Sequence, residues 1–167
     1  MSTDSYIAGI DNSTESIISF INGCTEEKLN LQPVGKWSIA DNLEHIILLE
    51  RIVLVLLQRP QTNKSGETEL YGYGKLEKIL IEGRTGNKVS APDNVHPKGK
   101  YKNSAEAKEA FLAQREKLKQ LIREGRLPEL NSIVPHPYLG EMTVADWLNL
   151  VPLHSLRHLD QMRELLL

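Results

Sequence analysis

The chain has 167 residues, of which 40% are hydrophobic and 25% are charged, as in ordinary globular proteins. This length predicts a single domain spanning residues 1–167. Its 20 Lys and Arg against 22 Asp and Glu give a formal net charge of −2. That balance argues against a general nucleic-acid-binding protein, because such proteins are usually strongly basic.

Apolar residues at helical spacing predict a first helix from about Tyr6 to the stop signal Asn22-Gly23. Thr25, followed by two glutamates, predicts the cap of a short helical turn, and residues 31–35 form a loop. Ser38 is a good N-cap for a long helix over residues 39–58. Arg59-Pro60 ends that helix.

Residues 60–103 form the irregular part of the chain, with a short helix expected around residues 75–81. Residues 82–102 are rich in Lys, Arg, Gly and Pro, which predicts a long basic loop. Asn103 or Ser104 caps a third long helix that runs to about Glu124 and ends at Gly125.

A second loop covers residues 127–141, and Thr143 caps a last helix from Val144 to near the C-terminus. Strand signals are nearly absent. Four long helices with two long connections predict an all-α fold, a four-helix bundle with long crossover loops.

Three histidines form the candidate site. His154 and His158 are four residues apart, so they lie one turn apart on one helix face and can converge on one cation. His45 lies in the first third of the helix over residues 39–58, and apolar residues surround it and the pair. Three neutral imidazoles bind Zn, Ni, Fe or similar ions, and a fourth position left to water makes such a site catalytic in type.

The three histidines do not by themselves require a metal. A His-x-x-x-His pair often arises by chance, and a histidine on an apolar face is often a hydrogen-bonded core residue. A di-iron carboxylate bundle needs Glu-x-x-His motifs, and the sequence has none. The His-Glu-x-x-His motif of zincins and the Cys-x-x-Cys-His motif of c-type haem attachment are also absent.

Two segments carry a resemblance to a known family. Trp37-Ser-Ile-Ala-Asp-Asn-Leu-Glu-His45 resembles the W-S-x-x-(D/E)-x-L-x-H signature of the DinB-like superfamily, whose YfiT-type members are described as metal-dependent hydrolases. The distal part, from His136-Pro-Tyr-Leu-Gly140 to His154-Ser-Leu-Arg-His158-Leu-Asp-Gln161, is similar to the ending of that family. The loop over residues 91–100 resembles its middle segment, so the match covers essentially the whole chain in order.

The resemblance implies a four-helix bundle that binds one divalent ion, Zn or Ni, through His45, His154 and His158, often as a homodimer. It leaves the activity open, since some members transfer low-molecular-weight thiols to electrophiles, others are isomerases, and fold alone does not fix a substrate.

Polar residues near the three histidines have two interpretations each. Asn42 and Gln161 are placed to orient a ligand histidine or a bound water, but either can be an ordinary bundle residue. Arg157 can hold a carboxylate or thiolate substrate, although pairing with Asp160 or Glu164 in solvent is the stronger expectation.

The remaining residues with reactive side chains favour structural roles. His96 and His136 lie beside prolines in loops, where turn chemistry is a stronger interpretation than a lid or a pH response. The single cysteine, Cys24, cannot form an internal disulfide. We see no signal-peptide pattern, and the longest apolar run, residues 52–57, is far short of the ~20 residues that span a bilayer. A cytoplasmic protein with no membrane partner is expected.

The sequence therefore favours a metalloenzyme acting on a small molecule, through a metal-bound water or a metal-bound thiolate. The alternative is a non-catalytic bundle that binds a metal or a small ligand for stability or sensing. Apolar residues nearly encircle the helix over residues 39–58, and a second copy of the chain is one way to cover them.

Overall fold

The computed structural model describes residues 2–86 and 90–167. Four long α-helices form the bundle, and two short α-helices lie in the connections between them along the chain. The long ones are α1 (Thr3–Asn22), α3 (Ile39–Gln58), α5 (Ser104–Arg123) and α6 (Val144–Glu164), and the short ones are α2 (Glu26–Asn30) and α4 (Gly72–Glu77). Within the described ranges the only extended pairing is three isolated bridges, so the all-α prediction is confirmed.

Local capping sets where the long helices begin. At the start of α3, the Ser38 hydroxyl accepts the Asp41 backbone N–H, and the Asp41 carboxylate accepts the Ser38 backbone N–H, both at 3.0 Å. Thr143 and Asp146 form the same reciprocal pair at the start of α6. Such a capping box satisfies backbone donors that the first turn leaves without partners. The predicted starts of these helices are confirmed.

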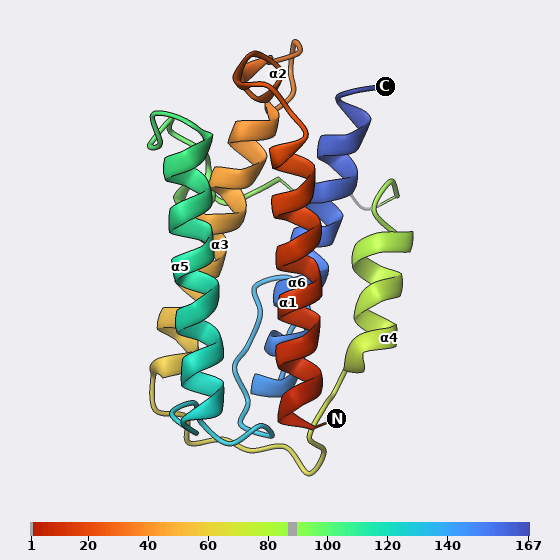
Figure 1. Cartoon of the computed structure of the whole chain (residues 1–167). Coiled ribbons are helices and arrows are strands. Elements are labelled where there is room, and N and C mark those ends of the chain that lie inside the picture. The colour runs from red at the N-terminus through yellow and green to blue at the C-terminus, as the bar shows by residue number, and fades with distance from the viewer. Residues whose placement is uncertain (1, 87–89) are drawn as a thin grey trace.

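The long helices pack as a bundle in which α1 and α6 run in one direction and α3 and α5 in the other (Figure 1). Both α1 and α3 contact α5 and α6, and α4 packs along α6. The connection from α3 to α5 includes α4 and returns the chain from the lower to the upper end of the bundle in this view, which makes it a crossover connection (Figure 1). The helix with His45 is therefore the antiparallel neighbour of the helix with His154 and His158.

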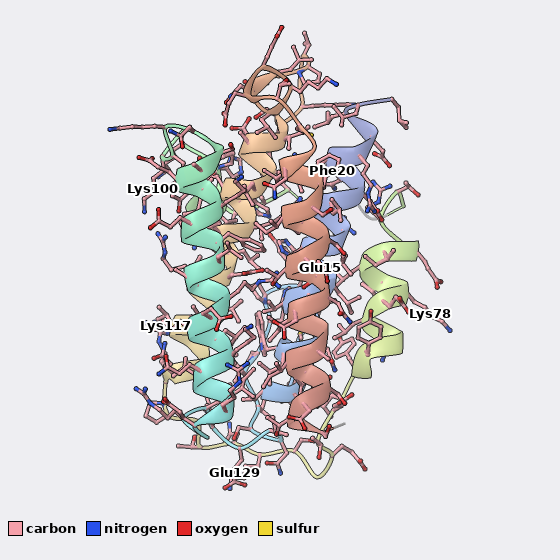
Figure 2. All side chains as sticks on the ribbon, viewed as in Figure 1. Glu15, Phe20, Lys78, Lys100, Lys117 and Glu129 are labelled. Atoms are coloured by element: carbon pink, nitrogen blue, oxygen red, sulfur yellow. The ribbon has the colours of Figure 1, made fainter. Side chains whose placement is uncertain are left out.

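Two apolar clusters fill the space between the helices. One lies around Phe111 and Leu43, and the other around Trp147 and Leu57, each made of side chains from several helices. Charged side chains such as Lys78, Lys117 and Glu129 extend outward from the bundle (Figure 2). No helix among the described residues is long and apolar enough to cross a membrane.

The short helix after α3 differs from its prediction. It begins at Gly72 rather than at residue 75, and a π-helical turn, Lys78–Glu82, continues it. The buried Asp146 carboxylate accepts the backbone N–H groups of residues 70, 71 and 72 at 2.9, 3.1 and 2.9 Å, which fixes the start of α4. Gly72 has a φ of +77°, a conformation that glycine adopts at little cost. This anchor lies 74 residues away along the chain, so local patterning does not reveal it.

A buried ion pair joins all four long helices. Arg115 of α5 is 1% exposed, and its Nε and Nη2 donate to the two carboxylate oxygens of Glu50 of α3 at 2.8 and 2.6 Å. Its Nη1 donates to α1 at the Ile10 carbonyl and the Ser13 hydroxyl, and its Nη2 also donates to Ser155 of α6. A bidentate pair with every donor engaged is the arrangement that makes a buried charge tolerable.

Removing one member of this pair should destabilise the fold strongly. We expect Arg115→Met or Glu50→Leu alone to cost about 3–5 kcal/mol of unfolding free energy, because each leaves one charge buried without its partner. The double variant should recover most of that loss, since Ser13 and Ser155 already donate to carbonyls of their own helices. Urea denaturation of the four proteins measures the effect. Single variants within about 1 kcal/mol of wild type would contradict this account.

Candidate metal centre

The structure brings the three predicted histidines together between α3 and α6. His45 comes from α3, and His154 and His158 come from successive turns of α6. One ring nitrogen of each lies within 4.8 Å of the others, and the Nε2 atoms of His45 and His154 are 3.3 Å apart. The three side chains could therefore hold one metal ion.

A loop carbonyl sets the orientation of His45. Its Nδ1 lies 2.8 Å from the backbone oxygen of Val95, in the 3₁₀ turn Asp93–Val95 that precedes α5. A carbonyl only accepts hydrogen bonds, so Nδ1 carries the proton and donates it. Consequently the lone pair of His45 is on Nε2, the atom that faces His154.

An asparagine one turn earlier in α3 does the same for His158. The Nδ1 of His158 lies 3.0 Å from the Asn42 Oδ1. The Asn42 Nδ2 donates to the Ser38 carbonyl at 2.9 Å, which fixes the orientation of the amide and leaves its oxygen for the histidine. His158 thus donates from Nδ1 and keeps its Nε2 lone pair for a ligand. Of the two interpretations that the sequence left open for Asn42, this contact favours the one in which it orients a histidine.

His154 differs from the other two histidines. Its Nδ1 is buried and has no hydrogen-bond partner within residues 2–86 and 90–167. The Nε2 proton of this ring can be donated to the Nε2 lone pair of His45, 3.3 Å away. To coordinate through Nε2 as a neutral imidazole, His154 would carry its proton on Nδ1, so it is the histidine whose tautomer would have to change when an ion binds.

All three imidazoles are held in the neutral form that metals require. Burial lowers the pKa of His45, and the nearby His96 adds to this effect. Burial, followed by the neighbouring imidazoles, lowers the pKa of His154 and of His158 well below the usual value. The positive charge of Arg157 also lowers the pKa of both α6 histidines. All three rings are therefore uncharged at neutral pH, with one nitrogen lone pair each available for an ion.

An aromatic wall covers one side of the site. The Trp37 ring centroid lies 4.9 Å from that of His45 and 6.4 Å from that of His158, with which it is nearly parallel. The His96 ring centroid lies 5.7 Å from that of Trp37 in an edge-to-face arrangement, and the His96 Nε2 donates to the Ala91 carbonyl. Trp37 thus shields the histidines from solvent and links them to the loop before α5.

Gln161 and Arg157 both lie near the α6 histidines. Gln161 lies beside His158 and raises the pKa of that histidine, an effect smaller than the burial that lowers it. The Nη1 of Arg157 donates to the Leu80 carbonyl at 2.9 Å.

The carboxylates expected beside Arg157 are engaged by other arginines. Glu164 pairs with Arg84, and Asp160 pairs with Arg163 at 3.4 Å. Arg84 comes from the connection after α4, so helical spacing within α6 does not predict its pairing with Glu164, whereas Asp160 and Arg163 are three residues apart on the same helix.

The other predicted polar residues lie outside the cluster of three histidines. His136 accepts the backbone N–H groups of residues 138 and 139 through Nδ1, so its turn role is confirmed. Cys24 is a partly buried thiol that donates to the Phe20 carbonyl. Neither they nor His96 contribute to the group that could hold an ion.

Two features of the site were not found from the sequence. The Val95 carbonyl is a backbone group with no sequence signal. Glu44 is a buried carboxylate directly before His45, and it binds backbone N–H groups of the loop before α5. Its position in a strongly apolar helix is the one signal that marks it, since a buried charge needs a partner.

The fold and the histidine cluster agree with the comparisons with known proteins. The chain belongs to the DinB superfamily, whose family model matches residues 10–162. It is 28% identical over 148 residues to the uncharacterized protein YuaE of Bacillus subtilis strain 168, a match that covers 87% of each chain. No solved structure matches the chain significantly. The resemblance inferred from the sequence motifs is thereby confirmed.

Protonation of the histidines should destabilise the metal-free protein. Their pKa values are lowered in the folded state, so below about pH 6.5 the unfolded chain binds more protons. Stability is therefore full above that pH and falls on acidification, by at most about 1.4 kcal/mol per pH unit for each histidine. Urea denaturation of chelator-treated protein at pH 7 and pH 5 measures the loss.

A His154→Leu variant serves as the control for that measurement, because it removes one titrating ring and keeps an apolar side chain. Its loss of stability between pH 7 and pH 5 should be smaller than that of wild type. Equal losses in the two proteins would show that His154 is not held neutral in the fold.

Proposed function

We propose that the chain is a metal-dependent enzyme that holds one divalent ion, Zn or Ni, on His45, His154 and His158 and acts on a small molecule. The convergence of the three histidines carries the proposal. Two of them donate from Nδ1 to fixed oxygens, which leaves their Nε2 lone pairs for an ion, and one ring nitrogen of each of the three lies within 4.8 Å of the others. Three neutral imidazoles with a remaining open position are a ligand set typical of catalytic metal sites.

The reaction class that fits this ligand set is hydrolysis or the transfer of a low-molecular-weight thiol. A bound ion would supply a Lewis acid that lowers the pKa of a water or a thiol. Asn42 keeps His158 oriented, Gln161 lies beside this histidine, and Trp37 limits the access of water from one side. The charge of Arg157, which acts on both α6 histidines, favours a substrate with a carboxylate or thiolate group.

The ligand assignment predicts a stoichiometry of one ion per chain. Changing any one of the three histidines to Ala should weaken binding by about 100-fold or more, because even an orienting residue beside a ligand costs 10–100-fold. Acidification towards pH 5 should release the ion, since imidazole must be neutral to coordinate. Elemental analysis of protein purified without an affinity tag measures the metal content.

His96→Ala and His136→Ala are the matched controls, and both should keep a metal content near that of wild type. Full retention of metal by His158→Ala would contradict the assignment.

Turnover separates an enzyme from a protein that only binds metal. The panel should include hydrolysis of activated esters and amides, and transfer of small thiols to an electrophile. An enzyme loses its activity on chelation and regains it with Zn or Ni, and His158→Ala stays inactive. Metal-dependent stability without turnover would favour the non-catalytic alternative. Activity that survives complete chelation would exclude the metal mechanism.

We also propose that two copies of the chain pair through α3. Leu48, Ile52 and Val55 recur at helical spacing along this helix, the first two partly exposed and Val55 49% exposed. Sedimentation equilibrium at micromolar concentration should give twice the chain mass of 18.9 kDa. Val55→Asp should shift the protein towards the monomer, while Leu112→Asp at an exposed site of α5 should not. A wild-type mass of 18.9 kDa would contradict the pairing.

A further inference from the structure

Two consecutive residues of α3 hold the same stretch of the connection before α5. His45 donates from Nδ1 to the Val95 carbonyl at 2.8 Å. The carboxylate of Glu44 accepts the backbone N–H groups of residues 98, 99 and 100 at 2.9, 3.0 and 3.2 Å. Residues 95–100 are thus attached to α3 at both ends, by one donor and by one acceptor.

The Glu44 contact is a strong one. Its side chain is 4% exposed, so the carboxylate depends on these hydrogen bonds in place of water. Hydrogen bonds to a charged group are roughly twice as strong as those between neutral groups. Gly99, with a φ of +69°, lets the backbone curl so that three successive N–H groups point at one carboxylate. This anchor therefore sets where residues 95–100 lie.

We propose that Glu44 is a positioning residue for the metal centre, a role that rests on the proposed function. It holds residues 95–100 so that the Val95 carbonyl meets the Nδ1 of His45. That carbonyl keeps the proton of His45 on Nδ1 and leaves the Nε2 lone pair facing the other two histidines. With the loop released, the proton can move to Nε2, and the ring can no longer coordinate from that atom.

Thermodynamic linkage gives this role a second consequence. If the position of residues 95–100 strengthens metal binding, then metal binding stabilises the position of these residues by the same factor. The segment includes His96, which packs against Trp37 at the wall of the site. Loading the site therefore makes this wall more rigid.

The molecule supplies a matched control for Glu44. Asp146 is also a buried carboxylate that accepts three successive backbone N–H groups, those of residues 70–72. None of those residues bonds to a histidine among the contacts of the described chain. Asp146 also accepts the Thr143 backbone N–H in the capping box of α6, two turns before His154. The two carboxylates thus hold their loops in the same way, and only the loop held by Glu44 contains a group that bonds to a candidate metal ligand.

The test compares Glu44→Gln with Asp146→Asn. Zinc affinity is measured by competition with a chelator, and the stability of each metal-free protein by urea denaturation. Both variants should be less stable than wild type, because each loses part of a buried anchor. Glu44→Gln should also bind zinc about 10–100-fold more weakly, whereas Asp146→Asn should keep its affinity within about threefold.

Backbone hydrogen exchange gives a readout that needs no substitution at Glu44. In wild type, zinc should slow exchange of the amides of residues 98–100 and leave those of residues 70–72 unchanged. His158→Ala should lose the zinc effect at residues 98–100. The same measurement keeps the inference testable if Glu44→Gln does not fold.

The inference is overturned if Glu44→Gln and Asp146→Asn bind zinc equally well, or if zinc leaves exchange at residues 98–100 unchanged in wild type. Two other results would instead show that the proposed function itself is wrong. If wild type binds no zinc, or if His158→Ala binds zinc as tightly as wild type, the histidine centre is wrong and the role of Glu44 falls with it.

Discussion

The buried pair of Arg115 and Glu50 is the constraint on which the arrangement of the four long helices depends. A guanidinium at the centre of a bundle is tolerated only if its donors are met, and here α1, α3 and α6 all supply acceptors. Its contact with α6 is made at Ser155, the residue after His154. The rotation of α6 that satisfies Arg115 is thus the rotation that turns the His154 side of this helix towards α3.

Hydrogen-bond donors in the long connections also need acceptors, and buried carboxylates of the bundle supply them. Backbone N–H groups in a crossover lack helical partners, and buried carboxylates of the bundle accept them in groups of three. Asp146 fixes the entry to α4, and Glu44 fixes the approach to α5. Because Glu44 precedes His45 directly, the carboxylate that holds this loop is adjacent in α3 to the histidine that donates to the loop carbonyl of Val95.

The features that could be predicted from the sequence are those that depend on residues close together along the chain. The starts of α3 and α6 follow from capping residues three positions apart, and the pairing of His154 with His158 follows from helical spacing. That His45 lies opposite this pair could be predicted only from the bundle topology. The resemblance of the sequence motifs to the DinB-like family supported that topology.

The remaining features depend on contacts between distant segments. The partners of Arg115 are 40 to 105 residues away, and those of Glu44 are 54 to 56 residues away. Arg84, a partner of Glu164, lies 80 residues earlier in the chain, a distance that local spacing does not reveal.

The central claim is that three imidazoles bind one ion through Nε2. A crystal structure of zinc-loaded protein, with anomalous diffraction at the zinc edge, tests it most directly. The account predicts one peak per chain at about 2.0–2.1 Å from the Nε2 atoms of His45, His154 and His158. A peak elsewhere, or no peak between α3 and α6, would contradict it.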